Sequence, residues 1–100
     1  NEVYRVLLET GDAGAYYTGR DWTTMGNVLR YNNTHDLGAE GDHANTMGFY
    51  FDDCDCGDAV YGNVFHNVAR GIMVGGGREH PIRNNVFSRC QIGLSIDCRV

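Results

Sequence analysis

Lysine is absent from this 100-residue chain, which has one proline and no apolar run long enough to cross a membrane. Its eight basic residues, all arginine, face 13 acidic residues, and the formal net charge is −5. A nucleic-acid-binding surface normally carries an excess of basic residues, so the composition argues against such a partner. A membrane-spanning helix needs about 20 consecutive apolar residues, so membrane insertion is not expected either.

The four cysteines lack the spacing of a metal-binding knuckle. One residue separates Cys54 from Cys56, and seven separate Cys90 from Cys98, whereas structural zinc sites combine two Cys-x2–4-Cys units. We therefore predict no metal site and no cofactor, and we interpret the thiols as unpaired or incidentally paired. The chain begins at Asn1 rather than at a methionine, and we expect it to be a fragment of a larger protein.

Short apolar segments follow a glycine at a nearly constant interval. The glycines are 23 and 22 residues apart, at Gly48, Gly71 and Gly93. Repeats of this length that consist of short strands and turns are typical of solenoids. Because the apolar residues alternate, we expect these pairs to point inward, stacked on one another: Phe49 and Phe51, Ile72 and Val74, Leu94 and Ile96. Between them, Tyr50, Met73 and Ser95 are expected to point outward. The predicted fold is all-β, a right-handed parallel β-helix of about four coils of ~22 residues.

A second column aligns Asn27, Asn63 and Asn85, at intervals of 36 and 22 residues. Asparagine tolerates a left-handed backbone, and stacked side-chain amides can bond to one another, so this column predicts a structural ladder at one bend per coil. The longer first interval indicates an insertion. We place it in the polar segment 32–46, as a loop that leaves a single β-helix domain spanning residues 1–100.

Acidic residues concentrate in two turns that the repeat places on neighbouring coils, residues 18–22 and 52–58. The first turn contains Asp21, and the second opens with Asp52 and Asp53. Cleavage of a glycosidic bond needs two carboxyl groups, one to donate a proton and the other to act as nucleophile or base. A single turn aspartate usually has no such role, but acids gathered at one edge of adjacent coils indicate a site.

The segment from Glu9 to Cys90 resembles the catalytic core of right-handed β-helix glycosidases. The motifs that carry the resemblance are DAGA-x-Y-x-GRDW and the paired aspartates in FYFDDCDCGDAVYGNVF. The closest family is glycoside hydrolase family 141, whose members act on plant polysaccharides as fucosidases and xylanases. The resemblance implies two catalytic aspartates, at Asp12 and Asp53. The strand register favours Asp21 as the alternative partner, because Asp12 precedes its strand whereas Asp53 follows its own.

Several neighbouring side chains are candidates for substrate binding. Aromatic rings stack on sugar faces, and arginine or histidine binds hydroxyl or uronate groups. On these grounds we assign substrate contacts to Tyr17, Arg20, Trp22, His35, Asp52 and Arg78. The expected partner is a polysaccharide or oligosaccharide, and the expected location is extracellular or periplasmic.

Two alternative functions remain open. A β-helix polysaccharide lyase would hold calcium through carboxylate oxygens, and the candidate ligands are Asp52, Asp53, Asp55 and Asp58. Such a lyase also needs a lysine or arginine base, and this chain offers only arginine. A non-catalytic carbohydrate-binding β-helix would show regular coils without an edge rich in acids.

Overall fold

The computed structural model describes residues 1–38 and 45–99, and the regular elements of this part are all strands. The first coil contains β1 (Glu2–Tyr4), β2 (Ala13–Gly19) and β3 (Val28–Arg30). The second contains β4 (Asn33–His35), β5 (Thr46–Asp52) and β6 (Ala59–Tyr61). The third contains β7 (Val64–His66), β8 (Arg70–Gly75) and β9 (Ile82–Arg83). The fourth contains β10 (Val86–Ser88) and β11 (Ile92–Asp97).

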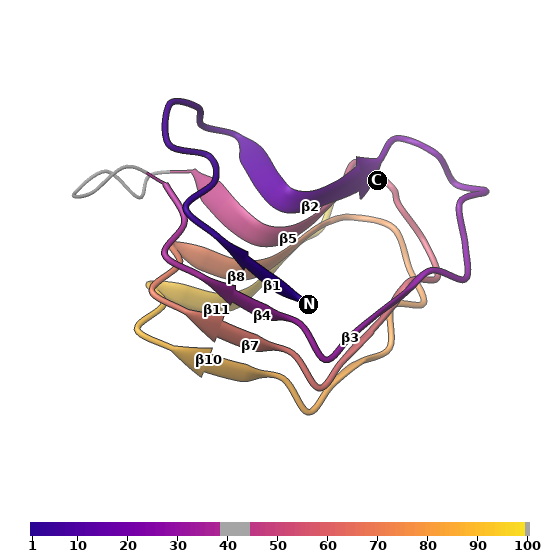
Figure 1. Ribbon diagram of the computed structural model, residues 1–100. Coiled ribbons are helices and arrows are strands. Elements are labelled where there is room, and N and C mark those ends of the chain that lie inside the picture. Colours follow the sequence, from indigo (N-terminus) through magenta and orange to yellow (C-terminus); the bar gives the residue numbers. More distant parts are fainter. Residues whose placement is uncertain (39–44, 100) are drawn as a thin grey trace.

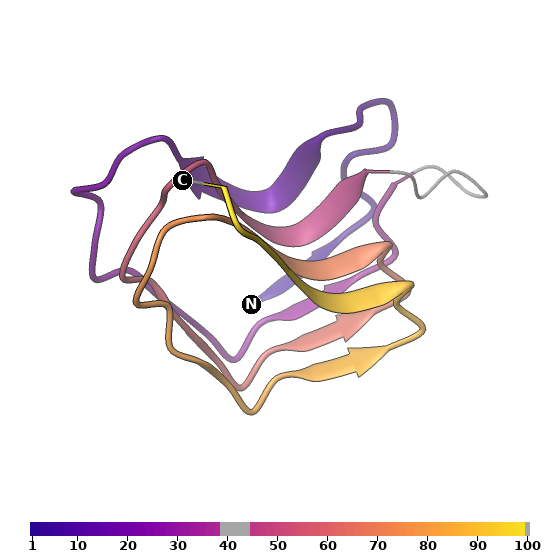
Figure 2. The same ribbon diagram turned by 180° about the vertical axis from the view of Figure 1, so that it is seen from behind.

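Each strand pairs in parallel with the strand three places before or after it in the chain, which builds three sheets. Sheet A has the order β1-β4-β7-β10, sheet B the order β2-β5-β8-β11, and sheet C the order β3-β6-β9. In Figure 1 the chain turns clockwise as successive coils recede from the viewer, and Figure 2 shows the last coil in front from the opposite side. The predicted right-handed parallel β-helix of about four coils is confirmed.

The predicted asparagine column is wrong at its first member. The ladder consists of Asn1, Asn32, Asn63 and Asn85, one residue from each coil. The Nδ2 of Asn32 donates to Oδ1 of Asn63 at 3.0 Å, and Asn63 donates likewise to Asn85. Asn1 extends the row with a 3.1 Å bond to Asn32. Asn27 lies at a different bend, before β3, where its backbone and side chain donate to Asp58.

The insertion also has different bounds from those predicted for residues 32–46. β4 begins at Asn33 and β5 at Thr46, so the connection spans residues 36–45, and 39–44 lie outside the described residues.

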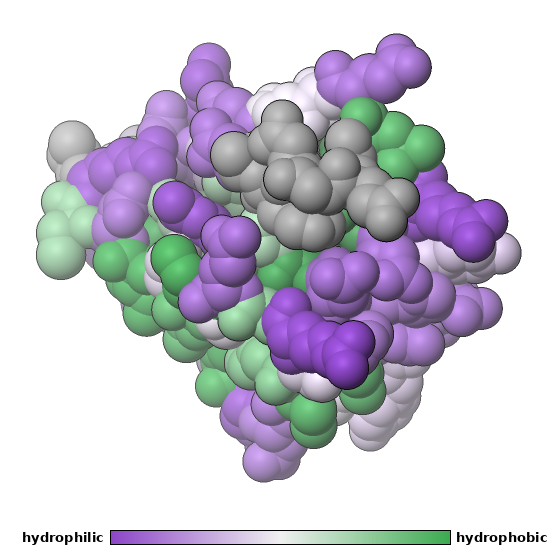
Figure 3. All heavy atoms as spheres, turned by 90° about the vertical axis from the view of Figure 1, so that its left-hand side faces the viewer, coloured by the Kyte–Doolittle hydropathy of each residue, from purple (hydrophilic) through white to green (hydrophobic). Residues whose placement is uncertain are grey.

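Figure 3 shows the side of the molecule where sheets A and B meet, with hydrophilic and hydrophobic side chains interspersed. The described residues contain no helix that is long and apolar enough to cross a membrane.

The core follows the alternation of sheet B. Register pairs Phe49 with Ile72, Ile72 with Leu94, and Phe51 with Val74, as the glycine column predicts. The buried side chains of the interior come from all three sheets: Leu29, Phe49, Phe51, Val60, Phe65, Ile72 and Val74. In the fourth coil the same positions are partly exposed, because no described strand covers β11 on its far side.

The outer face of sheet B is also covered. Tyr50 and Met73 alternate with the core residues and so point outward, as predicted, but only 4% and 2% of their surface is exposed. Together with Met47 they form a second apolar cluster. The ring of Tyr17 packs edge-on against Tyr50, with 5.3 Å between the ring centroids. This outer layer supports the acidic residues at the end of β5.

Candidate functional site

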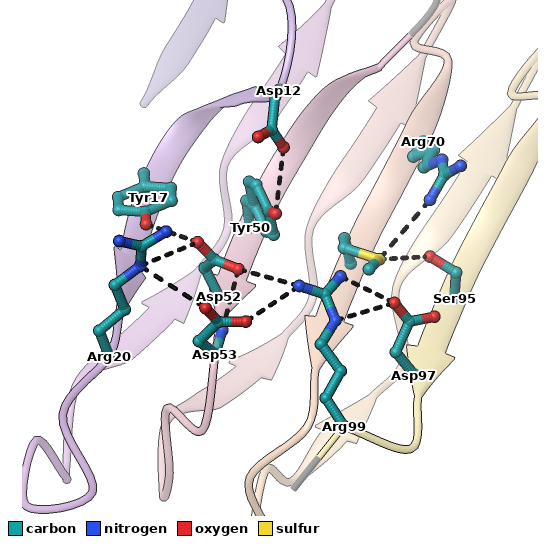
Figure 4. A network of polar contacts seen from close by, with 11 residues as sticks. Asp12, Tyr17, Arg20, Tyr50, Asp52, Asp53, Arg70, Ser95, Asp97 and Arg99 are labelled. Carbon is teal, nitrogen blue, oxygen red and sulfur yellow. Dashed lines mark hydrogen bonds and ion pairs between the residues drawn. The ribbon is translucent and has the colours of Figure 1, made fainter.

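The carboxyl-terminal edge of sheet B carries an acidic network, shown in Figure 4. The strand register places Gly19 of the first coil beside Asp52 of the second. It places Gly75 of the third coil beside Asp97 of the fourth, so Asp97 lies two coils from Asp52. A Cβ atom at Gly19 would lie 2.4 Å from the carbonyl oxygen of Asp52. Glycine at that position therefore allows the strand that bears the acids to approach, and glycine at position 75 leaves the space beside them without a side chain.

Asp52 is the buried centre of this network, and its side chain is 8% exposed. The hydroxyl of Tyr17 donates to its Oδ2 at 2.7 Å, and the backbone N–H of Asp53 donates to its Oδ1 at 2.9 Å. Burial opposes ionisation, but the hydrogen bonds from Tyr17, Tyr50 and the Asp53 amide outweigh it and lower the pKa of Asp52. Asp52 is therefore a fixed negative charge that orients its neighbours.

Asp53 is the accessible member of the pair, with 42% of its side chain exposed. Its Oδ1 lies 3.0 Å from Nη1 of Arg99, and its Oδ2 lies 3.6 Å from Nε of Arg20. Its φ angle of 24° lies outside the regions that L-residues ordinarily occupy. The backbone N–H of Arg20 donates to the carbonyl oxygen of Asp53 at 2.9 Å, which fixes this conformation against the first coil. The aspartate is thus held rigidly while its carboxylate faces solvent.

Arg99 completes the network, and neither it nor Asp97 was among the predicted site residues. Arg99 donates to Asp97 at 2.7 Å and to Asp53 at 3.0 Å, and these bonds raise the pKa of its guanidinium. Its side chain crosses the third coil at Gly75, where a Cβ atom would lie 3.4 Å from its Cζ. The repeat length is a sequence signal that could have identified Asp97 as a site residue, because Asp97 falls two repeat lengths after Asp52.

Asp12 joins the network through Tyr50. The hydroxyl of Tyr50 donates to Oδ1 of Asp12 at 3.2 Å. Burial, together with the carboxylates of Asp52 and Asp12, raises the pKa of Tyr50 to about 12. Tyr50 therefore connects Asp12, which precedes β2, with Asp52, which ends β5. Among the described residues, Asp12 forms no ion pair with arginine.

The structure places the other predicted residues away from this network. The carboxylate of Asp21 is bound within its own turn by the hydroxyl and amide of Thr23, and Trp22 beside it is 52% exposed. His35 lies on sheet A, where it bonds to Asp36 and Glu2. Arg78 lies in the turn after β8 and bridges to Cys56 on the preceding coil. Of the predicted set, the structure brings together Asp12, Tyr17, Arg20, Asp52 and Asp53.

Asp55 and Asp58 lie inside the solenoid, and each is fully buried. Thr18 donates to Oδ1 of Asp55 at 3.2 Å, while Oδ2 has no partner among the described residues. Burial, and next the charge of Asp58, raises the pKa of Asp55 to about 6. Across the next coil, Nε2 of His80 lies 2.9 Å from the carbonyl oxygen of Asp55.

The calcium site suggested for a lyase is therefore not assembled. Two of its four candidate ligands, Asp52 and Asp53, lie on the outer face, and the other two, Asp55 and Asp58, lie in the interior. Nowhere in the described part of the chain do three or more His, Cys, Asp or Glu side chains converge as metal ligands would. Among the described residues, Cys56, Cys90 and Cys98 are free thiols.

A cavity of about 390 Å³ lies in the interior at the first coil, with Val3, Tyr16, Leu29 and Phe49 in its lining. None of the networked acids lines it. Asp97 lines a second cavity, of about 190 Å³, at the fourth coil, whereas 42% of the Asp53 side chain is exposed on the outer face of sheet B. An exposed face of this kind suits an extended polymer better than an enclosed small molecule. No family model, no curated protein and no solved structure matches this chain.

Proposed function

We propose that the chain is part of a glycoside hydrolase of the β-helix type, resembling glycoside hydrolase family 141, that cleaves a plant-type polysaccharide. The observation that carries the proposal is the network on the outer face of sheet B, where Tyr50 interacts with Asp12 and Asp52, Tyr17 donates to Asp52, and the backbone N–H of Asp53 donates to Asp52. Glycosidic cleavage needs two carboxyl groups flanking the bond, held at fixed positions. An enzyme of this class acts outside the cell or in the periplasm, where its polymer substrates occur.

The surroundings of the acids suggest separate roles. Asp53 faces two guanidinium groups, at 3.0 and 3.6 Å, and its side chain is 42% exposed, so we assign it the role of nucleophile or base. Among the described residues, Asp12 forms no ion pair with arginine and accepts a hydrogen bond from the Tyr50 hydroxyl, so we assign it the role of proton donor. Asp52 is too enclosed to meet a substrate and positions Asp53 and Tyr17.

Substrate contacts in this proposal come from side chains around the acids. Tyr17 is 49% exposed and lies with its ring against Tyr50, which makes it the platform for a sugar ring. Arg20, whose side chain is 72% exposed, has N–H donors available for hydroxyl groups. Trp22 projects from the turn that follows Arg20 and would contact a more distant sugar of the same chain.

The test is hydrolysis of a panel of neutral and acidic plant polysaccharides by Asp53→Asn and Asp12→Asn variants. We expect release of reducing ends to fall at least about 100-fold in each, the lower bound for loss of a general acid or base. Added azide, a small anionic nucleophile, should partly restore cleavage to an Asp53→Ala variant if Asp53 is the nucleophile.

The matched control is Asp21→Asn, which makes the same charge change at a carboxylate that is bonded to Thr23 and not to the acidic network. Its activity should equal that of the unaltered chain. Full activity in folded Asp53→Asn would overturn the proposal. An unsaturated product detected by its ultraviolet absorbance would replace hydrolysis with lyase chemistry.

A further inference from the structure

A second surface feature lies on the outer face of sheet C, at the end of its strands. Register stacks Arg30, Tyr61 and Arg83 on three successive coils. The Cζ atom of Arg83 lies 4.9 Å from the centroid of the Tyr61 ring, and Nη1 of Arg30 donates to the Tyr61 hydroxyl at 3.1 Å. One tyrosine therefore holds two guanidinium groups in place, one on either side along the solenoid axis.

Tyr31 adds a second aromatic ring beside this column. It is 66% exposed and meets Tyr61 edge-on, with 5.9 Å between the ring centroids. The Cζ atom of Arg30 lies 5.7 Å from the centroid of Tyr31. Gly62 leaves the space that the ring occupies, since a Cβ atom there would lie 2.7 Å from two ring carbons. The Tyr31 ring thus packs against Gly62 on one side while the rest of its surface remains accessible.

The charges in this column are not neutralised. Among the described residues, neither Arg30 nor Arg83 forms an ion pair, whereas Arg20 and Arg99 on sheet B are each bound by aspartates. A guanidinium group has five N–H donors, and a single hydrogen bond is found for Arg30. Donors that are oriented by a ring but unpaired with an acid are suited to bind an anion from solution.

We propose that the four residues Arg30, Tyr31, Tyr61 and Arg83, here called the sheet C arginine column, bind an anionic polysaccharide whose sugars carry carboxylates. Guanidinium groups bind carboxylates through paired hydrogen bonds, and tyrosine rings offer an apolar surface to the sugar ring. The inference goes beyond the proposed hydrolase, because the column lies past the turn after sheet B and contains none of the acids assigned to catalysis.

The spacing of the column favours a polymer over a small anion. Arg30 and Arg83 lie two strands apart, and strands are about 4.8 Å apart, so their backbones are separated by about 10 Å. Two cations at that separation on an open face match charges that recur along a chain. Nucleic acid fits less well, because its binding depends on many basic contacts and this chain has a net charge of −5.

The experiment measures binding of polygalacturonate to the whole chain by titration calorimetry, with a neutral xylan of similar length for comparison. Replacing both arginines, Arg30→Gln with Arg83→Gln, should weaken polygalacturonate binding about tenfold or more. Added salt should weaken binding by the unaltered chain more than binding by the variant. Tyr31→Ala removes an exposed ring and should cost several-fold in affinity without disturbing the fold.

The matched control is Arg5→Gln with Arg89→Gln, which removes the same two charges at exposed arginines outside the column. It should bind polygalacturonate as the unaltered chain does. Binding by Asp53→Asn should also be unchanged, which keeps the result separate from the hydrolase proposal. Equal binding of the neutral xylan, an undiminished affinity in the double variant, or equal affinity for single-stranded DNA would each overturn the inference.

Discussion

Two pairs of aspartates lie within seven residues of one another, yet their surroundings are opposite. Asp52 ends β5 and Asp53 follows it on the outer face, where hydroxyl, amide and guanidinium groups surround them. Asp55 and Asp58 turn into the interior, and both are fully buried. The pKa of Asp52 is lowered, whereas that of Asp55 is raised to about 6. At the turn after β5, the direction in which an aspartate side chain points therefore determines its surroundings, since the residue type is the same at all four positions.

The carboxylates of this turn have two different roles, one on the outer face and one in the interior. On the outer face, hydrogen-bond donors lower the pKa of Asp52, and the exposed carboxylate of Asp53 remains available to a ligand. In the interior, Asp58 accepts three hydrogen bonds from Asn27 and fixes the bend before β3, while Asp55 keeps one oxygen without a partner. The inner pair is structural and the outer pair is a candidate for chemistry. Three substitutions test this division by their effects on stability.

Asp58→Ala should have the largest effect. It removes the acceptor of the Asn27 backbone N–H, bonded at 3.1 Å, and leaves that group unpaired. We expect the free energy of unfolding to fall by about 2–3 kcal/mol at neutral pH, as measured by urea denaturation. Asp58→Asn, which keeps an oxygen acceptor, is the control and should lose less. Equal losses in the two variants would show that the hydrogen bonds to Asn27 are not the stabilising feature.

Asp55→Asn should have a smaller effect of the opposite sign. The folded pKa of Asp55, about 6, lies above its unfolded value of about 4. Its contribution to stability is therefore complete below about pH 4 and is lost as pH rises through about 6. The amide cannot ionise, so the variant should be more stable at pH 7, by on the order of 1–2 kcal/mol. Urea midpoints across this range check the prediction, and an unchanged pH dependence would contradict it.

Asp52→Asn should have the smallest effect. Because the pKa of Asp52 is lowered, its contribution is present above about pH 4 and is lost as pH falls through the folded value. The variant keeps an acceptor for Tyr17, so we expect a loss of about 1 kcal/mol at pH 7. The difference from the unaltered chain should vanish in acid, as it does for Asp55→Asn, but at pH 7 the two variants should differ from the unaltered chain in opposite directions. The same trend at both positions would remove the distinction between the two pairs.

Much of the fold was predictable from the sequence, because the same pattern of a glycine before an apolar segment occurs three times at a nearly constant interval. Gly48, Gly71 and Gly93 each precede an alternating apolar segment, and the register confirms all three. The asparagine ladder was harder, since both Asn27 and Asn32 stand before a short strand. Backbone pairing decides between them: it joins Asn33 to Val64, so Asn32 aligns with Asn63. An interval of 31 residues with an insertion could not be distinguished from one of 36 by pattern alone.

The site was predictable only where its residues share a turn. Asp53 ends an apolar strand, a break in alternation that stands out in the sequence. Tyr50 read as an ordinary outward residue, because no local pattern shows that its hydroxyl reaches Asp12. Arg99 lies 46 residues after Asp53 and approaches it through stacking of coils. A contact between side chains of different coils depends on how the coils stack and where each side chain points, and the repeat period alone does not predict it.

The absence of a side chain at position 75 has a consequence for how such a chain can evolve. A solenoid lengthens when a whole coil is duplicated, since each coil ordinarily contacts only its neighbours. The acidic network breaks that independence, because Arg99 of the fourth coil reaches Asp53 of the second across Gly75. A coil inserted between them would add about 4.8 Å and end the contact. The segment from β5 to Arg99 must therefore be inherited as one unit, whatever is gained or lost elsewhere along the axis.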